Sequence, residues 1–315
     1  MTGTSTLQIQ LSDELASKSP LPSLSPAIPG SWLSKPGNVL TFVPNGAFSP
    51  LSTISLTIPA GAGGLKAKDG STLAAPVSYS WNVQDGSVLR LQELLATLGY
   101  LPVTWAAANP APLTSPQQAL AAFQPPPGSF TWNWSAPSEL TSTWLPGQST
   151  VVVRGAVMAF ERVSGLPVDG VTSAALWTKL LQAAEGPTLA SNTGGYTYAL
   201  VSKAKPETMT VWHNGAVAVQ TAVNTGIAGD PTVDGTFPVY EHLASQVMSG
   251  TNPGGSHYAD PVSWVAYFNG GDAVHYISRS TFGYPQSLGC VEAPYNAAEQ
   301  AWPYLQVGTL VTVTG

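Results

Sequence analysis

The sequence predicts a multidomain, mainly β protein: an N-terminal β-sandwich, a small three-helix domain, and a C-terminal β-rich domain with one late helix. Short segments near both ends alternate polar and apolar residues, whereas apolar residues between about 86 and 185 recur at helical spacing. The 31 glycines and 28 prolines favour turns. A length of 315 residues suits two or three domains, since a domain commonly has about 100–200 residues.

The first domain is predicted over residues 1–85. Thr53–Ile58 and Val77–Val83 alternate with period two, which is typical of a strand with one buried face. Val39–Val43 is a further short strand that ends at a Pro-Asn-Gly turn. The segment resembles bacterial Ig-like modules, and this resemblance implies a spacer without a site of its own.

The second domain is predicted over residues 86–185 and is helical. Val88–Leu98 has apolar residues at helical spacing, and Gly99 follows where a helix end favours a left-handed residue. A Pro-, Trp- and Ser-rich insert of about 103–148 then interrupts the pattern. Two more helices are expected at about 152–163 and 173–184.

Three pieces of this helical segment resemble a peptidoglycan-binding domain of the three-helix kind: Leu91–Tyr100, Ala156–Glu161 and Gly165–Val171. The resemblance implies docking on the glycan-peptide polymer of a cell wall. The alternative is that the helices only support the insert, because similarity of fold does not establish binding. Residues 186–194 are predicted to be a linker.

The third domain is predicted over residues 195–315 and is β-rich. Asn214-Gly215 lies between two apolar runs, which is a strong signal for a hairpin. One helix is expected after the strands, at about 295–304. The predicted strands are 196–201, 208–212, 216–219, 237–240, 263–268, 273–277 and 310–313.

The composition excludes several classes of partner. Only 9% of the residues are charged and the net charge is −6, with no basic run, so we expect no nucleic acid partner. No apolar run reaches the roughly 18 residues of a membrane helix, and the N-terminus does not have the pattern of a signal peptide. Low charge and Ser/Thr/Pro-rich segments favour the mature form of an extracellular, cell-wall protein. We expect no cofactor and no metal, since the four histidines lack ligand spacing.

One cysteine and one histidine are the candidate catalytic pair. A free thiol is mostly protonated at neutral pH, and a nearby imidazole can take its proton. His275 ends a predicted strand, and Cys290 returns after a loop that contains glycine and proline, so the two side chains can meet. Gly289 allows close approach of a substrate, and its N–H with that of Cys290 could form an oxyanion hole.

This arrangement resembles the L,D-transpeptidase catalytic domain of the YkuD type. The resemblance rests on the strand-end His275, Ser287-Leu288-Gly289-Cys290 some fifteen residues later, the following helix, and the final strand of Gly308–Val313. It covers about residues 195–315, and Asn224–Gly226 and Asp234–Val239 match as well.

The resemblance implies that Cys290 attacks a peptidoglycan stem peptide at its third residue and releases D-alanine. A neighbouring stem then resolves the acyl-cysteine, which gives a 3→3 cross-link, and carbapenem-type inhibitors are expected to bind. His275 acts as base and then as acid. Candidate substrate-binding or supporting residues are Ser287, Tyr276, His257, Tyr258, Tyr284 and Arg279.

Two positions depart from the family pattern. Leu288 stands where a histidine is common, and Glu292 stands where arginine or asparagine is common, so a carboxylate replaces a cation. Two alternatives stay open beside the transpeptidase. One is an L,D-carboxypeptidase, in which water resolves the acyl-enzyme, and the other is a cell-wall-binding protein without activity.

Overall fold

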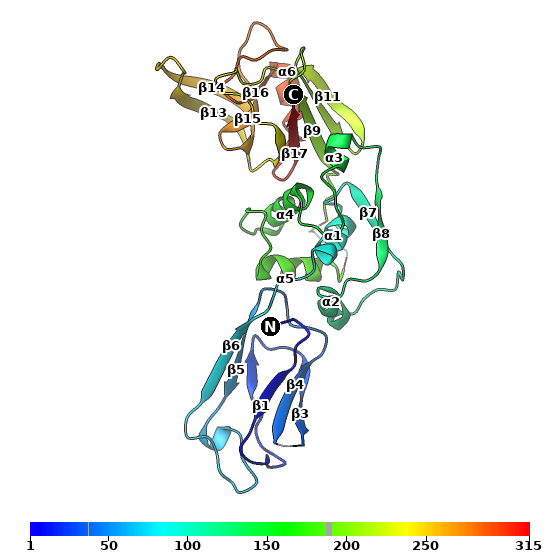
Figure 1. Ribbon diagram of the computed structural model, residues 1–315, viewed down its shortest axis with the longest axis vertical. Helices are drawn as coiled ribbons and strands as arrows, with labels where there is room; N and C mark the ends of the chain where they lie inside the picture. The colour runs from blue at the N-terminus through cyan, green and yellow to red at the C-terminus, as the bar shows by residue number, and fades with distance from the viewer. Residues whose placement is uncertain (37, 187–190) are drawn as a thin grey trace. The chain divides into compact units, whose positions relative to one another are not determined.

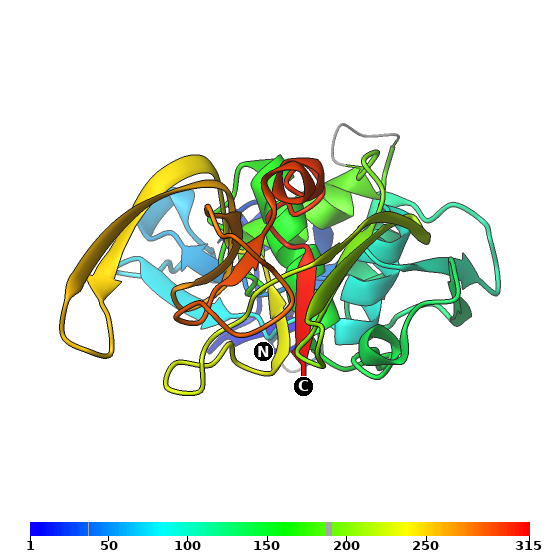
Figure 2. The ribbon, with the colours of Figure 1, turned by 90° about the horizontal axis from the view of Figure 1, so that it is seen from above.

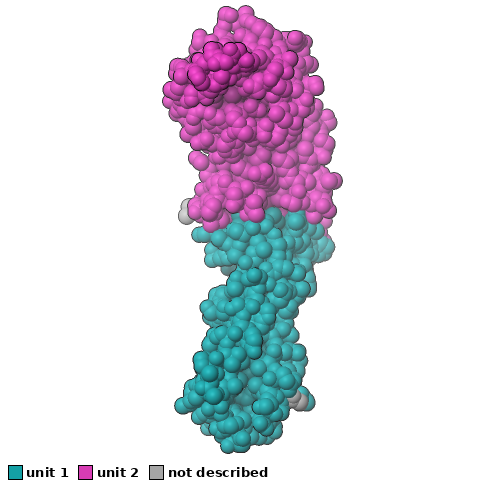
Figure 3. Space-filling view, turned by 60° about the vertical axis from the view of Figure 1, so that its left-hand side comes forward, with its two compact units in different colours: residues 1–91, 109–127, 172–186 teal, residues 92–108, 128–171, 187–315 magenta. Residues whose placement is uncertain are grey.

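The computed structural model describes residues 1–36, 38–186 and 191–315. The chain divides into two compact units (Figure 3), and it passes between them more than once. Unit 1 comprises residues 1–91, 109–127 and 172–186, and unit 2 comprises 92–108, 128–171 and 187–315. The linker predicted for 186–194 lies partly outside the described residues.

The β-strands of unit 1 form two antiparallel three-stranded sheets, drawn in blue and cyan in Figure 1. Residues of both sheets pack together in two buried clusters, in which Leu7, Phe42 and Ile54 of one and Leu40 and Leu56 of the other are at most 5% exposed. A 3-10 turn, η1, spans Gly61–Gly63. The first sheet has the order β1 (Leu7–Gln10), β4 (Val39–Pro44), β3 (Gly30–Lys35), and the second β2 (Ser23–Ser25), β5 (Thr53–Ile58), β6 (Val77–Asn82).

Helices occupy the middle of the chain. Their buried faces are mostly apolar, although α1 also buries Gln92 and Glu93 and α4 buries Glu161. Gly165 adopts φ +68° at the end of α4, where a left-handed residue ends a helix. The helices are α1 (Val88–Thr97), α2 (Ser115–Ala121), α3 (Ser138–Thr141), α4 (Val151–Ser164) and α5 (Ala174–Ala183).

The stretch of about 103–148, expected only to interrupt the helices, contains regular structure. Its strands β7 (Val103–Ala107) and β8 (Gly128–Trp132) pair antiparallel. Trp105 packs against Phe130 with ring centroids 4.8 Å apart. The sequence does not predict this pairing, because each strand is a short apolar run near prolines. The two strands are also far apart in the sequence, so no local turn signal indicates that they pair.

The C-terminal part of unit 2 has two sheets and the helix α6 (Tyr295–Ala301). Buried Val, Ala and Phe residues of both sheets and of α6 form one core. The five-stranded sheet has the order β11 (Ala216–Ala222), β10 (Thr208–His213), β9 (Thr197–Ser202), β17 (Leu310–Thr314), β12 (Gly235–Pro238). The four-stranded sheet has the order β13 (Glu241–Thr251), β14 (His257–Asn269), β15 (Asp272–Tyr276), β16 (Val291–Ala293).

The β13–β14 hairpin is longer than the sequence predicted. It projects beyond the rest of its sheet, as the yellow and orange ribbon of Figure 2 shows. Only 263–268 was expected to be a strand here. In the outer half of the hairpin, half-buried and exposed residues alternate, but the residue types do not follow this alternation: Gln246 and Asp260 are half-buried, whereas Val247 is exposed. Among the described residues, no helix combines the length and the apolar character needed to span a membrane.

Candidate active site

A cavity of about 460 Å³ in the C-terminal part of unit 2 brings the candidate catalytic pair together. His275 and Cys290 both line it. Three of the other predicted residues, Tyr258, Arg279 and Ser287, line it as well. The structure therefore places five of the predicted site residues around one space.

The sheet and a polar segment hold the two catalytic candidates in place. His275 lies on β15, opposite Glu292 in the parallel strand β16, and Cys290 directly precedes β16. Asn224 anchors the loop between the two strands: its side-chain oxygen accepts from the N–H of Gly283 at 3.1 Å, and its side-chain nitrogen donates to the carbonyl of Thr281 at 3.1 Å. The buried Asn224 thus fixes the path of the chain from His275 to Cys290.

A buried carboxylate supports the same segment. Glu207 is 1% exposed and accepts a hydrogen bond from the N–H of Thr225 at 2.7 Å. Thr225 in turn accepts from the N–H of Ser287 at 3.0 Å through its carbonyl. The sequence indicates Asn224–Gly226 only as a family match and gives no signal for Glu207, because neither is adjacent in sequence to the loop that it supports.

The imidazole of His275 is buried and neutral. The residue is 2% exposed, and its Nδ1 is enclosed without a hydrogen-bond partner. Burial lowers the pKa of His275 below its usual value of 6.5, although the backbone of Tyr276 and the charge of Glu292 act in the opposite direction. At neutral pH the ring therefore has a nitrogen lone pair that can accept a proton.

The thiol of Cys290 is protonated in the resting protein. Burial raises its pKa to about 12, and the negative charges of Asp272 and Glu292 raise it further. A hydrogen bond from the backbone of Ala273 lowers the pKa but does not offset these effects. Sγ donates to the carbonyl of Gly271 at 3.7 Å. The site therefore holds a neutral thiol and a neutral imidazole, so the thiol needs a base at the moment of attack.

A titration of the thiol tests this electrostatic state. The difference in ultraviolet absorbance between the wild type and Cys290→Ser reports the thiolate as the pH is raised. We expect this difference to stay constant between about pH 6 and pH 10, whereas an unperturbed thiol titrates near pH 8.5. A step below about pH 8 would contradict the neutral resting pair.

The residues before Cys290 shape the backbone around the thiol. Gly289 adopts φ +106°, which side chains rarely permit, and a Cβ built there would lie 2.3 Å from Oδ1 of Asp272. Ser287 is 3% exposed, and its hydroxyl donates to the carbonyl of Cys290 at 2.5 Å. In the described part of the chain, the N–H groups of Gly289 and Cys290 donate no backbone hydrogen bond outside regular elements.

Comparison with known families identifies this region. Residues 196–313 match the family model of YkuD, the L,D-transpeptidase catalytic domain. This part of the chain is a YkuD domain. The match confirms the resemblance found for the C-terminal domain, while the Ig-like and peptidoglycan-binding resemblances stay predictions.

Solved structures with a detectable similarity include L,D-transpeptidases. The enzyme from Mycobacterium smegmatis is 13% identical over 100% of this chain and 93% of its own, with a TM-score of 0.35. The catalytic domain from E. faecium is 26% identical over 38% of this chain and 96% of its own, with a TM-score of 0.35. L,D-transpeptidase 3 from Mycobacterium tuberculosis, in complex with a faropenem-derived adduct, is 12% identical over 100% and 93%, with a TM-score of 0.36. No curated protein matches the chain.

The β13–β14 hairpin supplies one wall of the cavity in the YkuD domain. Met248, Tyr258 and Asp260 line the cavity from this hairpin. His257 does not line it: this residue is exposed, and its Nδ1 lies 3.2 Å from the hydroxyl of Thr251. The position of His257 at the start of a strand, one residue before Tyr258, directs it to the other face of the hairpin.

Three other predicted residues, Tyr276, Tyr284 and Gly289, also lie outside the cavity lining. Tyr276 packs edge-on against Tyr295, with ring centroids 5.0 Å apart, and contributes to the core. Tyr284 is 40% exposed, and its hydroxyl bonds to that of Thr281. Strand alternation explains Tyr276, since it faces away from its neighbour His275.

The carboxylate that replaces a cation in the family pattern is paired. Glu292 is 3% exposed and receives two hydrogen bonds from Arg279, Nε to Oε2 at 2.8 Å and Nη2 to Oε1 at 2.5 Å. The two residues stand thirteen positions apart, on opposite sides of the catalytic loop. The pair could not be predicted from the sequence, because it depends on how that loop folds.

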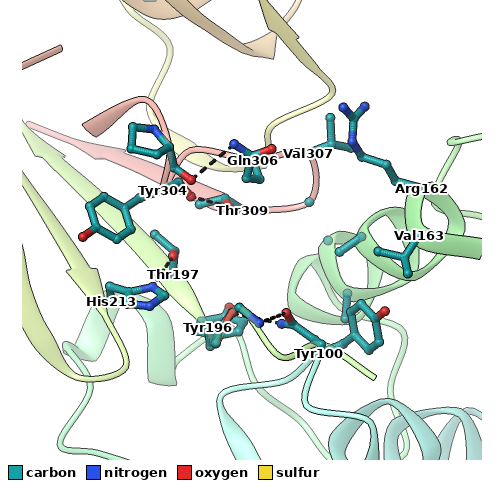
Figure 4. Close-up of a pocket in the computed structure, with 18 residues that line it drawn as sticks. Tyr100, Arg162, Val163, Tyr196, Thr197, His213, Tyr304, Gln306, Val307 and Thr309 are labelled. Carbon is teal, nitrogen blue, oxygen red and sulfur yellow. Dashed lines mark hydrogen bonds between the residues drawn. The ribbon is translucent and has the colours of Figure 1, made fainter. Parts of the chain in front are cut away.

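A second cavity in unit 2, also of about 460 Å³, contains neither catalytic candidate. Figure 4 shows His213, Thr197 and Tyr304 on one side of it and Arg162 and Val163 on the other. His213 bonds to the Thr197 hydroxyl through Nδ1 at 3.0 Å. Among the described residues, no three His, Cys, Asp or Glu side chains are grouped so that they could hold a metal ion.

Proposed function

We propose that this protein is a peptidoglycan L,D-transpeptidase that forms 3→3 cross-links through an acyl-enzyme on Cys290. The observation that carries the proposal is that His275 and Cys290 line one cavity within a YkuD domain. A cysteine acyltransferase needs a thiol, a base that can take its proton, and space for a peptide, and the cavity contains all three.

In the first half-reaction, the sulfur of Cys290 attacks the carbonyl carbon of the third stem residue while its proton passes to His275. The neutral imidazole can accept this proton because burial keeps the pKa of His275 low. The negative charge that develops on the carbonyl oxygen is stabilised by the N–H groups of Gly289 and Cys290. The C–N bond then breaks, and His275 returns the proton to the leaving D-alanine amine.

In the second half-reaction, an amine of a neighbouring stem attacks the thioester. His275 takes a proton from this amine, an amide bond forms, and the sulfur leaves and regains its proton. The product is a dimer of two stems, and one D-alanine is released for each cross-link. Water in place of the amine would give hydrolysis, which is the carboxypeptidase reaction.

The surrounding chain fits a role at the cell wall. Peptidoglycan is an extracellular polymer, so we propose that the protein acts outside the cytoplasm. The segment 86–185 is proposed to hold the glycan-peptide polymer near the YkuD domain. A β-lactam of the carbapenem type is expected to acylate Cys290, since related L,D-transpeptidases have been solved with imipenem and with a faropenem-derived adduct.

A transfer assay tests the proposal. Purified protein is incubated with a disaccharide-tetrapeptide, and the products are resolved by liquid chromatography and mass spectrometry. The expected product is a 3→3 dimer whose mass equals two substrates minus one D-alanine, and it is absent with Cys290→Ala. Accumulation of tripeptide alone would favour the carboxypeptidase, and no Cys290-dependent product would favour a binding protein.

A further inference from the structure

Asp272 fills the space that a side chain at Gly289 would need. It is the first residue of β15, three positions before His275, and a Cβ built at Gly289 would lie 2.3 Å from its Oδ1 and 3.2 Å from its Cγ. The carbonyl of the preceding residue, Gly271, accepts the hydrogen bond from Sγ of Cys290. The start of β15 and the residue before it therefore contact both the nucleophile and the backbone that precedes it.

Two hydrogen bonds hold the Asp272 carboxylate in this place. It accepts from the side chain of Asn269, at the end of β14, and from the backbone N–H of Val233. Among the described residues, no ion pair joins it to a lysine, an arginine or a histidine. The side chain is half-buried, so its charge acts on its neighbours with less screening than a charge in open water.

The neighbour on which this charge acts is the thiol. Burial is the largest cause of the raised pKa of Cys290, and Asp272 is the first of the charges that add to it. The charges that act on the pKa of His275 come from other residues: Glu292, Arg279 and Asp260. An ionised Asp272 therefore disfavours the negative charge that develops on sulfur, with no comparable stabilisation of the imidazolium.

Asp272 changes its own charge near neutral pH. Burial raises its pKa to about 6, and the charge of Asp230 acts in the same direction, whereas its two hydrogen bonds lower the pKa. The other titratable groups coupled to it are Tyr240 and Cys290, whose raised pKa values keep both protonated in this range. The carboxylate is therefore mostly ionised above about pH 6 and mostly neutral below it.

We propose that Asp272 is a positioning residue that restrains Cys290: its side chain supports the backbone at Gly289 and, while ionised, it holds the thiol in its protonated, slowly reacting form. Protonation of Asp272 removes the charge and keeps the contact, so the restraint is lifted in acid. The inference rests on the proposed function and adds a regulation of the same site.

Alkylation of Cys290 by iodoacetamide tests the restraint without requiring turnover, and Cys290 is the only cysteine in the sequence. Rates are followed by intact mass from pH 5 to pH 9 for the wild type and for Asp272→Asn, which has nearly the same shape and no charge. We expect the variant to react about three- to tenfold faster above pH 7, the effect of one nearby charge. The ratio of the two rates should decline to about onefold by pH 5, because the wild-type carboxyl, with a pKa of about 6, is then neutral as well.

Further variants separate the charge of Asp272 from its packing. In an Asp230→Asn background, the decline of the ratio should move to lower pH, because the charge of Asp230 raises the pKa of Asp272. Asp13→Asn, at an exposed position of unit 1, should match the wild type throughout. Asp272→Ser also lacks the charge and gives the same comparison if Asp272→Asn does not fold. Asp272→Gly alone is the reference rate for any variant that changes both Asp272 and Gly289.

A ratio that is the same from pH 5 to pH 9 would overturn the inference, whether the two proteins react equally, differ by a constant factor or do not react. An Asp272→Asn protein that reacts more slowly than the wild type at pH 8 would overturn it as well, since Asp272 would then only support the structure. A failed transfer assay would reject the proposed function and leave the alkylation ratio unaffected.

Conversely, transfer by a protein whose alkylation ratio does not change with pH would retain the function and reject the restraint.

Discussion

Replacing His275 with glutamine lowers the rate of Cys290 acylation by about 10²–10⁴-fold, the usual contribution of a general base. The loss is expected to be near the upper end, because the thiol has a pKa of about 12 and few thiolates form without a base. The measurement is the pseudo-first-order rate of acylation by a carbapenem, followed by intact mass. His213→Gln is the matched control, since His213 lies in the other cavity.

The pH dependence of the acylation rate also tests the role of His275 as the base. The wild-type rate falls on the acid side only below about pH 6.5, because the pKa of His275 is lowered and the neutral form is the active one. The His275→Gln variant should lose this acidic limb. If it reacted at close to the wild-type rate with the same pH profile, another group would be the base.

Replacing Gly289 with alanine is expected to lower acylation by about 10²-fold or more, comparable to the loss of an oxyanion-hole donor. A Cβ would lie 2.3 Å from Oδ1 of Asp272, at a φ of +106° that disfavours any side chain. The clash and the unfavourable φ would both shift the Gly289 and Cys290 N–H groups, which are proposed to stabilise the oxyanion. The rate of carbapenem acylation and the circular dichroism spectrum together separate this effect from unfolding.

Gly229→Ala is the matched control for that substitution, since no atom lies within 4 Å of the Cβ that it would introduce. The double variant Gly289→Ala/Asp272→Gly removes the clash with the carboxylate but keeps the unfavourable φ. A partial recovery of the acylation rate would show that both the clash with Asp272 and the unfavourable φ contribute to the loss. A fully active, folded Gly289→Ala would show that this backbone conformation is not needed for acylation.

Local sequence patterns were sufficient to predict most of the strands and that His275 and Cys290 lie at one cavity, while their catalytic roles stay a prediction. His275 and Cys290 could be found because each lies beside a strand and a glycine-rich loop, a short-range arrangement that residue types reveal. The long hairpin β13–β14 was underestimated, since its exposed outer half has no one-sided apolar pattern. The β7–β8 pair was also not predicted, because its short strands have no clear alternation of apolar and polar residues.

The electrostatics of the site depend on contacts that the sequence does not encode locally. Glu292 places a carboxylate where the family pattern has a cation, and the folded loop brings Arg279 onto it. The raised pKa of Cys290 follows from burial and from the charges of Asp272 and Glu292, which converge only in the tertiary structure. His257 and Tyr284 were placed at the site from their loops, yet strand direction and loop path turn them away.

The most direct test of Cys290 as a nucleophile served by His275 is intact-protein mass spectrometry after incubation with a carbapenem. The wild type should gain the mass of one inhibitor molecule, peptide mapping should locate it on Cys290, and Cys290→Ala should gain nothing. An adduct that persisted in Cys290→Ala, or a wild type that remained unmodified at saturating inhibitor, would contradict acylation in the cavity shared by His275 and Cys290.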